Sequence, residues 1–333
     1  MKKNRVSFLG DSNNLNIKKI LLDGMLLPII IILTYIIFTI IEPDFAHIGN
    51  SVNILKQSSY LIILSLAQLV VLLTRGFDLS VGNVISMISV SSAMTMVAVL
   101  KSNSGAVGSA IFLGCLVGFG IGILVGCFNG FIVSKLNVSP FITTLGMQGI
   151  ALGFATTLSD GFPVFDVPVK FMNIFSKSSW LGIPVPILIA IIVILLVHLF
   201  LKYTIIGRGF YIIGSNPQAA YIAGIPVKRY LFMAYVICAS ITAIVALALT
   251  ARTCSGEPYL GGGLMMSSMM AACIGGVSLR GGSGTVKNCI LGGIFVTLLS
   301  NGMNMIRIDS YYQMIILGIV LISAIFIDRL QVR

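Results

Sequence analysis

Long stretches of the chain are apolar at nearly every position, without the alternation of apolar and polar residues that marks a half-buried strand. Runs of about 20 apolar residues can cross the roughly 30 Å hydrocarbon core of a bilayer as α-helices. We therefore predict an all-α polytopic bundle of about ten transmembrane spans. The expected spans are 24–42, 57–74, 83–100, 107–127, 140–158, 184–201, 230–250, 264–278, 288–306 and 311–327.

The same pattern predicts one transmembrane domain over residues 24–328, flanked by cytoplasmic tails at 1–23 and 329–333. The first apolar run is too long for the core of a signal peptide, and no small-residue cleavage site follows it, so we expect it to be retained. For the fifth and eighth segments, a re-entrant path is the alternative to a full span and would change the topology.

Composition agrees with this assignment. Hydrophobic residues make up 57% of the chain and charged residues 9%, and the mean hydropathy is +1.05. With the N-terminus inside, fifteen Lys and Arg fall in cytoplasmic segments and six in outer ones, which together are all 21 in the chain. The positive-inside rule expects this bias. The net charge of +11 therefore reflects topology, and nucleic-acid binding is not needed to explain it.

The fourth predicted span carries small residues at every fourth position. Such a stripe lies on one face of a helix and lets neighbouring backbones approach closely, since packing drives helix association in lipid. We interpret it as helix packing within one chain, with a homodimer seam as the alternative. The stripe consists of Gly114, Gly118, Gly122, Gly126 and Gly130.

Glycine-containing breaks interrupt the apolar pattern at residues 75–82 and 257–263. Each break precedes a helix rich in Met and Ser, at comparable places in the two halves of the chain. This indicates a five-plus-five internal repeat, an arrangement that transporters use to build sites from interrupted helices. A third glycine-rich stretch, 275–284, is expected to form a tight cytoplasmic turn. The phosphate-binding pattern GxxxxGK[ST] is absent from the chain, so we expect no ATP binding here.

One long polar and basic segment, residues 207–230, separates two predicted spans within a cytoplasmic loop of about 202–230. Asn216 is a good N-cap residue and Pro217 suits the first position of a helix. A helix of about two turns would end at Ala223, because Gly224 favours the position after a C-cap. Such a short helix is marginal in water by itself. We therefore expect it to pack against the bundle or against a soluble partner.

Several segments resemble one known family when they are read in chain order. The segments are LLTRGFDLSVGNVISM, SKLNVSPFITTLGM, GSNPQAAYIAGI, ACIGGVSLRGGSGTV and the tail NGMNMI…YYQMIILGIVLISAIFID. Together they run from about residue 52 to 328. This set is similar to the membrane-spanning permease subunits of ribose-type ABC sugar importers, in which the third segment contacts the ATPase.

The resemblance implies a role for each matching residue. Those expected to fit a cleft in a cytoplasmic ABC ATPase are Asn216, Pro217, Ala219, Ala220 and Gly224. Those expected near the translocation path are Asp78, Ser80, Gly82, Gly275, Gly276, Ser278, Gly281 and Gly284. The chain departs from the family at Thr74-Arg75, where members usually carry small residues including glycine. It departs again at Arg280 and Ser283, where a small polar residue and an arginine are common.

The resemblance also implies partners and a location. ATP and Mg²⁺ would be bound by the separate ATPase and not by this chain, and an extracytoplasmic binding protein would deliver the solute. A second permease copy or a paralogue would complete a dimer in a bacterial cytoplasmic membrane, with both termini in the cytoplasm. The expected substrate is a ribose-like monosaccharide or a similar small polar solute, although the added charge of Arg75 makes inference of the substrate from ribose transporters unsafe.

Asp78 is the one acidic residue expected at membrane depth, which makes it a functional candidate. The alternatives are local: Asp78 caps the following helix, or it pairs with Arg75. Gln68 and Asn129 are expected to form hydrogen bonds between helices. The six cysteines and two histidines show no metal-ligand spacing, and no acid pair or nucleophile–base set suggests an enzyme.

Other functions remain open on the sequence alone. An ABC permease for nucleosides, a furanosyl signal molecule or branched-chain amino acids would carry the same motifs. An ion-coupled secondary carrier would need carboxylates along its spans, and this chain offers essentially one. A membrane scaffold would leave the capped loop helix unexplained.

Overall fold

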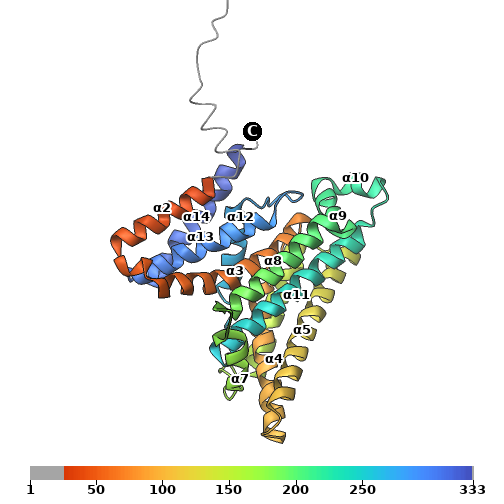
Figure 1. Cartoon of the computed structure of the whole chain (residues 1–333). Helices are drawn as coiled ribbons and strands as arrows, with labels where there is room; N and C mark the ends of the chain where they lie inside the picture. Colours follow the sequence, from red (N-terminus) through yellow and green to blue (C-terminus); the bar gives the residue numbers. More distant parts are fainter. Residues whose placement is uncertain (1–25, 332–333) are drawn as a thin grey trace, which may run out of the picture.

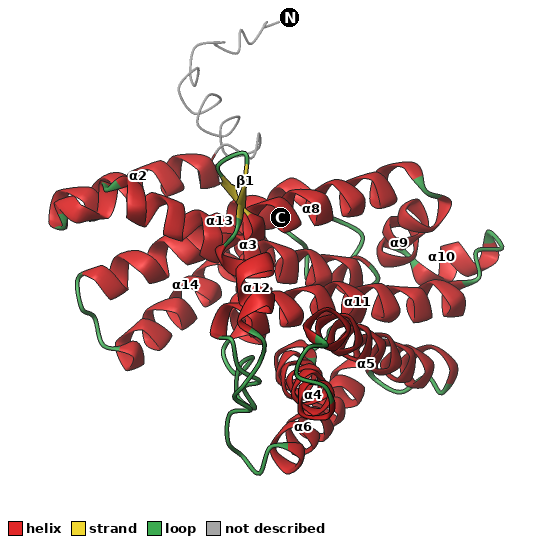
Figure 2. Cartoon of the chain, turned by 60° about the horizontal axis from the view of Figure 1, so that its bottom comes forward, coloured by secondary structure: helices red, strands yellow, loops and turns green. Residues whose placement is uncertain are grey.

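The computed structural model describes residues 26–331, with side chains to residue 323. The predicted tail at 1–23 lies outside the described residues. Helices make up most of the described chain (Figures 1 and 2). The long helices are α2 (Leu26–Ile41), α3 (Ile48–Leu73), α4 (Val81–Ser102), α5 (Val107–Lys135), α6 (Pro140–Leu158), α8 (Val185–Tyr203), α9 (Ile205–Ser215), α11 (Val227–Thr253), α12 (Leu264–Gly275), α13 (Val286–Met305) and α14 (Ser310–Gln331).

Shorter elements fill the connections. They are the 3₁₀ turn η1 (Pro43–Ala46), α7 (Val169–Met172), the π-helical turn η2 (Asn173–Lys177), the small hairpin β1 (Ser179–Trp180) and β2 (Ile183–Pro184), and α10 (Pro217–Ile222). The helix α10 stands at one end of the bundle, at the upper right of Figure 1, and the α4–α5 turn lies at the opposite end.

Each of the ten predicted spans overlaps one long helix, which confirms an all-α membrane bundle. Among the described residues, seven helices are long and apolar enough to cross a membrane: α3, α4, α5, α6, α8, α11 and α13. The fifth predicted span is the continuous 19-residue helix α6. The eighth is wrong as a full helix, because α12 has 12 residues and rises only about 18 Å.

A non-helical segment, residues 255–263, precedes α12 and runs beside α4. The Glu257 N–H donates to Ser89 Oγ at 3.1 Å, and the Gly261 N–H donates to Ser86 Oγ at 3.0 Å. Non-helical backbone is tolerated at membrane depth only where protein or a water-filled cavity surrounds it. The serines of α4 supply part of that surrounding. The segment itself is a series of turns, in which the Leu260 N–H donates to Glu257 O at 3.4 Å and the Gly262 N–H donates to Tyr259 O at 3.2 Å.

Helix packing supports the predicted internal repeat. Helix α5 of the first half packs along α11 of the second, and α13 of the second half packs along α3 of the first. In this correspondence α3 matches α11, α4 matches α12 and α5 matches α13. The contact of α4 with α5 is therefore repeated by that of α12 with α13, and the contact of α4 with α11 by that of α12 with α3. An odd number of spans in each half makes such repeats inverted with respect to the membrane. The first helices of the halves, α2 and α8, do not follow this correspondence.

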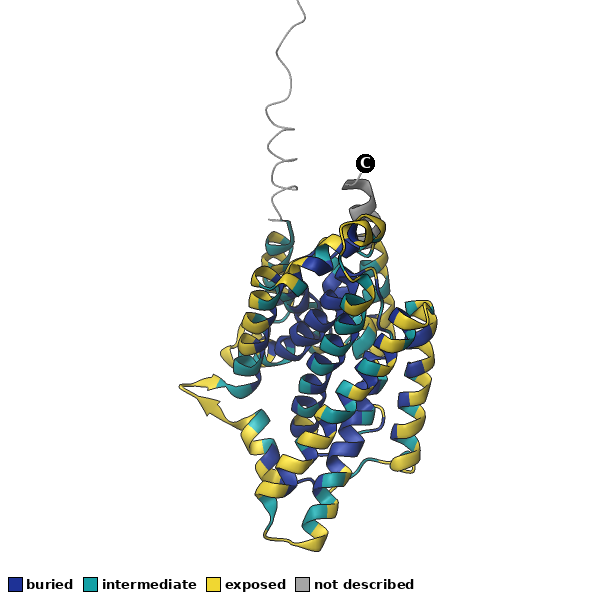
Figure 3. Ribbon diagram, turned by 90° about the vertical axis from the view of Figure 1, so that its right-hand side faces the viewer, coloured by how far each residue is buried: buried dark blue, intermediate teal, exposed yellow. Residues whose placement is uncertain are grey.

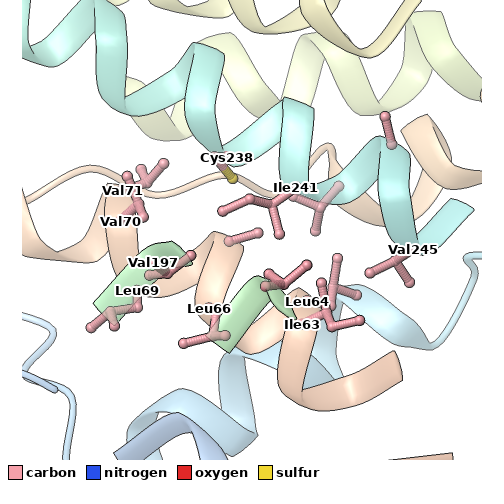
Figure 4. Packing of buried hydrophobic residues seen from close by; sticks show 14 of the residues in the cluster. Ile63, Leu64, Leu66, Leu69, Val70, Val71, Val197, Cys238, Ile241 and Val245 are labelled. Atoms are coloured by element: carbon pink, nitrogen blue, oxygen red, sulfur yellow. The ribbon is translucent and has the colours of Figure 1, made fainter. Parts of the chain in front are cut away.

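The core is centred on α3, in which every residue from Ser58 to Leu73 is buried. Figure 4 shows Cys238, Ile241 and Val245 of α11 facing apolar side chains of α3. Large apolar side chains on the outer helices remain exposed, and exposed residues form the outer rim of the bundle in Figure 3. Such a rim suits contact with lipid.

The glycine stripe of α5 packs within this chain, as its first interpretation predicted. A Cβ on Gly122 would lie 2.7 Å from the Ala243 Cβ, and one on Gly126 would lie 2.8 Å from the Val236 Cα. All five stripe residues are buried against α4 or α11. The homodimer alternative is therefore wrong, because no face of the stripe remains free for a second copy.

We expect Gly126→Ala to lower the stability of the protein by about 1–3 kcal/mol, the usual cost of overpacking a dense core. The matched control is Gly120→Ala on the same helix, where no atom lies within 4 Å of the added Cβ. It should be neutral, or stabilising by up to about 1 kcal/mol through helix propensity. Thermal aggregation of both variants in mild detergent measures the difference. Equal midpoints would contradict the packing role of the stripe.

Candidate functional site

The short helix α10 begins as its sequence predicts. Asn216 is the N-cap, and its Oδ1 accepts hydrogen bonds from the N–H groups of Gln218 and Ala219, both at 3.0 Å. Pro217 occupies the first helical position, where its missing N–H costs nothing. Two of the free donors at the helix start are thereby satisfied within the loop itself.

The helix ends in a Schellman motif. The Ile225 N–H donates to Ala220 O at 3.0 Å, and the Gly224 N–H donates to Tyr221 O at 3.0 Å. Gly224 has a φ of 80°, a conformation that glycine adopts without steric cost. The predicted limits of the helix are confirmed, with Ala223 as the C-cap. Hydrogen bonds within the loop therefore cap both ends of α10.

Helix α10 turns one small side chain inward and its large apolar side chains outward. Ala220 is fully buried, whereas Tyr221 is 75% exposed and Ile222 79% exposed. A groove of about 560 Å³ lies beside the helix, lined by Tyr221, Gly224, Pro226 and Lys228 among others and reaching Lys135 at the end of α5. Exposed apolar residues on a polar, rigid loop are typical of a protein-docking surface.

The first part of the predicted polar loop is the helix α9, which the sequence analysis did not predict. Thr204 caps its start by accepting a hydrogen bond from the Gly207 N–H at 2.9 Å. Phe210 and Ile213 are buried on its inner face. A signal was present, because Gly207, Phe210 and Gly214 recur at helical spacing after a threonine N-cap.

The last residues of α9 meet two other segments at the α10 end of the bundle. Arg75 donates from Nε to Gly214 O and from an Nη to Ser215 O, both at 2.6 Å. The Gly282 N–H donates to Leu73 O at 3.0 Å. We call this contact between the end of α3, the end of α9 and the 281–284 turn the junction. The suggested Arg75–Asp78 pair does not form, because the guanidinium points toward α9.

The glycine-rich stretch 275–284 is a tight turn, as predicted. The Ser278 N–H donates to Ser283 O at 3.0 Å, and Gly276, Gly281, Gly282 and Gly284 have φ values between 72° and 150°. A Cβ on Gly275 would lie 2.0 Å from Asn288 O of α13. Of the residues predicted to lie near the path in this stretch, Gly281 and Gly284 belong to the junction, whereas Gly275 and Gly276 face Asn288 of α13.

Tyr211 ties α9 to the same turn. Its hydroxyl donates to Gly284 O at 3.0 Å. Burial raises the pKa of the Tyr211 phenol, and the neighbouring Cys289 thiol raises it further. The hydroxyl therefore stays protonated and remains a donor at physiological pH.

Deeper in the bundle, Asp78 organises the break before α4. It is 2% exposed, and its Oδ1 accepts from the Ser80 N–H at 2.9 Å and from Ser80 Oγ at 2.5 Å. Gln68 donates to the Asp78 backbone carbonyl at 2.9 Å, and Asn129 donates to Ser80 Oγ at 3.1 Å. The predicted bonds of Gln68 and Asn129 across helices are confirmed. Asp78 takes the local role at the start of α4, where Ser80 is the N-cap.

Gly82, one turn further on, touches the second break. A Cβ on Gly82 would lie 2.6 Å from Gly261 O, and one on Gly261 would lie 1.7 Å from Gly82 O. The second break therefore meets the first turn of α4 backbone to backbone. Gly82 was predicted to belong to the candidate site, but Gly261 was not, because its role depends on a partner 179 residues away in the chain.

Comparison with known proteins gives consistent relatives. A probable ABC transporter permease protein, y4mJ of Sinorhizobium fredii, is 36% identical over 84% of this chain and 81% of its own. The D-allose transport system permease protein AlsC of Escherichia coli is 32% identical over 88% of each chain. The ribose import permease protein RbsC of Haemophilus influenzae is 33% identical over 96% of this chain and 97% of its own.

No solved structure matches the chain significantly. Residues 50–325 match a sequence family over most of the chain, including both breaks, the junction and α10. The chain belongs to the family described as branched-chain amino acid transport system / permease component, whose members are multi-pass membrane proteins of transport systems.

Proposed function

We propose that this chain is the permease subunit of an ABC importer that carries a monosaccharide into a bacterial cell. Three relatives are named as permeases for allose, ribose and arabinose, which supports a sugar as the substrate. The work would come from a separate ATPase that binds ATP and Mg²⁺. An extracytoplasmic binding protein would supply the sugar, and a second permease copy or a paralogue would complete the pathway.

The α10 end of the bundle would face the cytoplasm, with both termini on that side. Charge supports this orientation, because Arg75, Lys135, Arg208, Lys228 and Arg229 all lie at that end. Positive side chains accumulate on the cytoplasmic side of membrane proteins. A cytoplasmic ATPase would then meet α10 first.

The docking role rests on one observation: α10 is capped at both ends and displays Tyr221 and Ile222 to solvent. A rigid helix transmits a push, whereas a flexible loop would absorb it. Closure of the ATPase would move α10 as a body and rock the packed helices behind it, in the manner of hinge or shear motion. The basic groove beside it would guide docking by charge.

The two kinds of alternative function, other ABC permeases and an ion-coupled carrier, differ in how well the structure supports them. Permeases for nucleosides, a furanosyl signal or branched-chain amino acids would use the same α10 surface, so the distinction lies in the solute delivered. An ion-coupled carrier is less favoured, because one oxygen of Asp78 already accepts two hydrogen bonds from Ser80. Arg75 does not supply a counter-charge to Asp78, since it bonds to α9.

Charged residues on the outward face of α10 should block transport. We expect Tyr221→Asp and Ile222→Asp each to reduce uptake by at least about tenfold, as loss of a docking hot spot does. Gly224→Asp, which alters the C-cap, and Ala220→Glu, which places a charge in the buried contact, should abolish uptake. Radiolabelled sugar uptake in cells, normalised to the amount of permease in the membrane, measures each variant.

Tyr221→Phe and Ile222→Leu are the matched controls, since they keep the apolar surface and should transport normally. Full uptake in all four disruptive variants at normal membrane levels would rule out α10 as the docking element.

The energy source separates the two classes of transporter. We expect uptake of labelled ribose or allose to stop when cellular ATP is depleted and to continue when the ion gradient alone is collapsed. Competition by unlabelled nucleosides, leucine and other sugars then identifies the class of solute. Uptake that survives ATP depletion and fails with the ion gradient would overturn the ABC assignment.

A further inference from the structure

Arg75 adopts a backbone conformation that its residue type disfavours. Its φ is 63°, in the left-handed region where a side chain meets the backbone. The turn that ends α3 holds this conformation, since the Arg75 N–H donates to Leu72 O and the Gly76 N–H donates to Val71 O, both at 3.0 Å.

The Arg75 side chain forms two hydrogen bonds with the end of α9. A helix leaves its last carbonyls without partners inside the helix, and its C-terminus attracts positive charge. Arg75 bonds two of these carbonyls, Gly214 O and Ser215 O, each at 2.6 Å. The planar guanidinium suits two adjacent acceptors better than a lysine would. The next residue, Asn216, is the N-cap of α10, so Arg75 holds the point from which α10 starts.

The junction holds the Arg75 side chain in place from behind. A Cβ on Gly281 would lie 2.5 Å from the Arg75 Cγ, so only glycine leaves room there. A Cβ on Gly214 would lie 1.8 Å from Leu73 O, so the ends of α9 and α3 are in backbone contact. Movement of the start of α10 therefore cannot leave Arg75 behind unless these contacts separate.

The residues that follow Arg75 in the chain run directly into the bundle. Phe77 O accepts from the Tyr235 hydroxyl of α11 at 3.2 Å, and Asp78 and Ser80 are bonded to α3 and α5. Gly82 then touches Gly261 of the second break. Residues 75–82 thus connect the hydrogen bonds at the end of α9 to the contact between α4 and the second non-helical segment.

We propose that Arg75 is a positioning residue that locks α10 to the break before α4, so that displacement of α10 moves the non-helical segments inside the bundle. This rests on the proposed function only in naming the ATPase as the source of the displacement. The mechanical link itself is a property of this chain and can be measured without a partner.

The test uses Arg75→Gly, which removes the side chain and also relieves the positive φ, so the backbone gains no new strain. Arg75→Asn is a second variant, because asparagine tolerates the same conformation without reaching α9. Arg75→Lys retains the positive charge but lacks the planar guanidinium that bonds both carbonyls at once. The matched control is Arg280→Ala, which removes an exposed arginine of the adjacent turn.

The first readout is amide hydrogen exchange of the full-length permease alone in lipid nanodiscs. We expect Arg75→Gly and Arg75→Asn to speed exchange in 215–226 and in 76–80 together, by about tenfold, which corresponds to one charge-assisted hydrogen bond. Arg75→Lys should fall between these variants and wild type, and Arg280→Ala should match wild type. Exchange rates in Arg75→Gly and Arg75→Asn equal to those of wild type would overturn the proposal. If one of the two does not fold, the other decides.

The second readout adds the ATPase that copurifies with the wild-type permease. Its binding should change exchange at 76–82 in wild type, and Arg75→Gly should keep the binding but lose that change and lower uptake per ATP hydrolysed. A preserved response in Arg75→Gly would overturn the link while leaving the docking role intact. Failure of any ATPase to bind wild type would overturn the proposed function, and the first readout would then decide the link.

Discussion

Two stretches of non-helical backbone inside the bundle impose the constraint that shapes this protein. Peptide groups at membrane depth have no water to bond, so each one left unpaired is costly. The break before α4 takes partners from Gln68 of α3, Tyr235 of α11 and, through Ser80, Asn129 of α5. The break before α12 takes them from Ser86 and Ser89 of α4. Polar side chains inside the apolar helices are placed where these segments pass.

The same constraint explains the distribution of glycine. Gly82 in the first turn of α4 meets Gly261 of the second break, and α5 approaches α11 through its stripe, because neither contact leaves room for a Cβ. In lipid the close fit of helices replaces the hydrophobic drive that holds a soluble core together.

Much of this fold could be predicted from the sequence. Runs of apolar residues located the helices, and the Asn216-Pro217 start and Gly224 end of α10 were correct because caps are local signals. The eighth span was placed as one helix because 264–278 is apolar, whereas the glycines before it and at 275–276 confine the helix to 12 residues. Helix α9 was missed because it lies along the bundle end, half buried and not in a span.

The contacts of the candidate site were harder to predict, since they join residues far apart in the chain. Asp78 and Arg75 are three residues apart and of opposite charge, which suggested a pair. The left-handed backbone at Arg75 turns its side chain to α9 instead. Likewise Gly261 has no side chain from which its contact with Gly82 could be predicted. Local charge and spacing do not encode where a turn directs the next side chain.

The central claim is that α10 connects this chain to an external motor. The most direct measurement is purification of the tagged full-length protein from its native membrane in mild detergent, with partners identified by mass spectrometry. The account predicts a stoichiometric ATPase with nucleotide-binding motifs, which is lost when residues 215–226 are replaced by a Gly/Ser linker. Recovery of the permease without such an ATPase, or an ATPase retained by the linker variant, would contradict it.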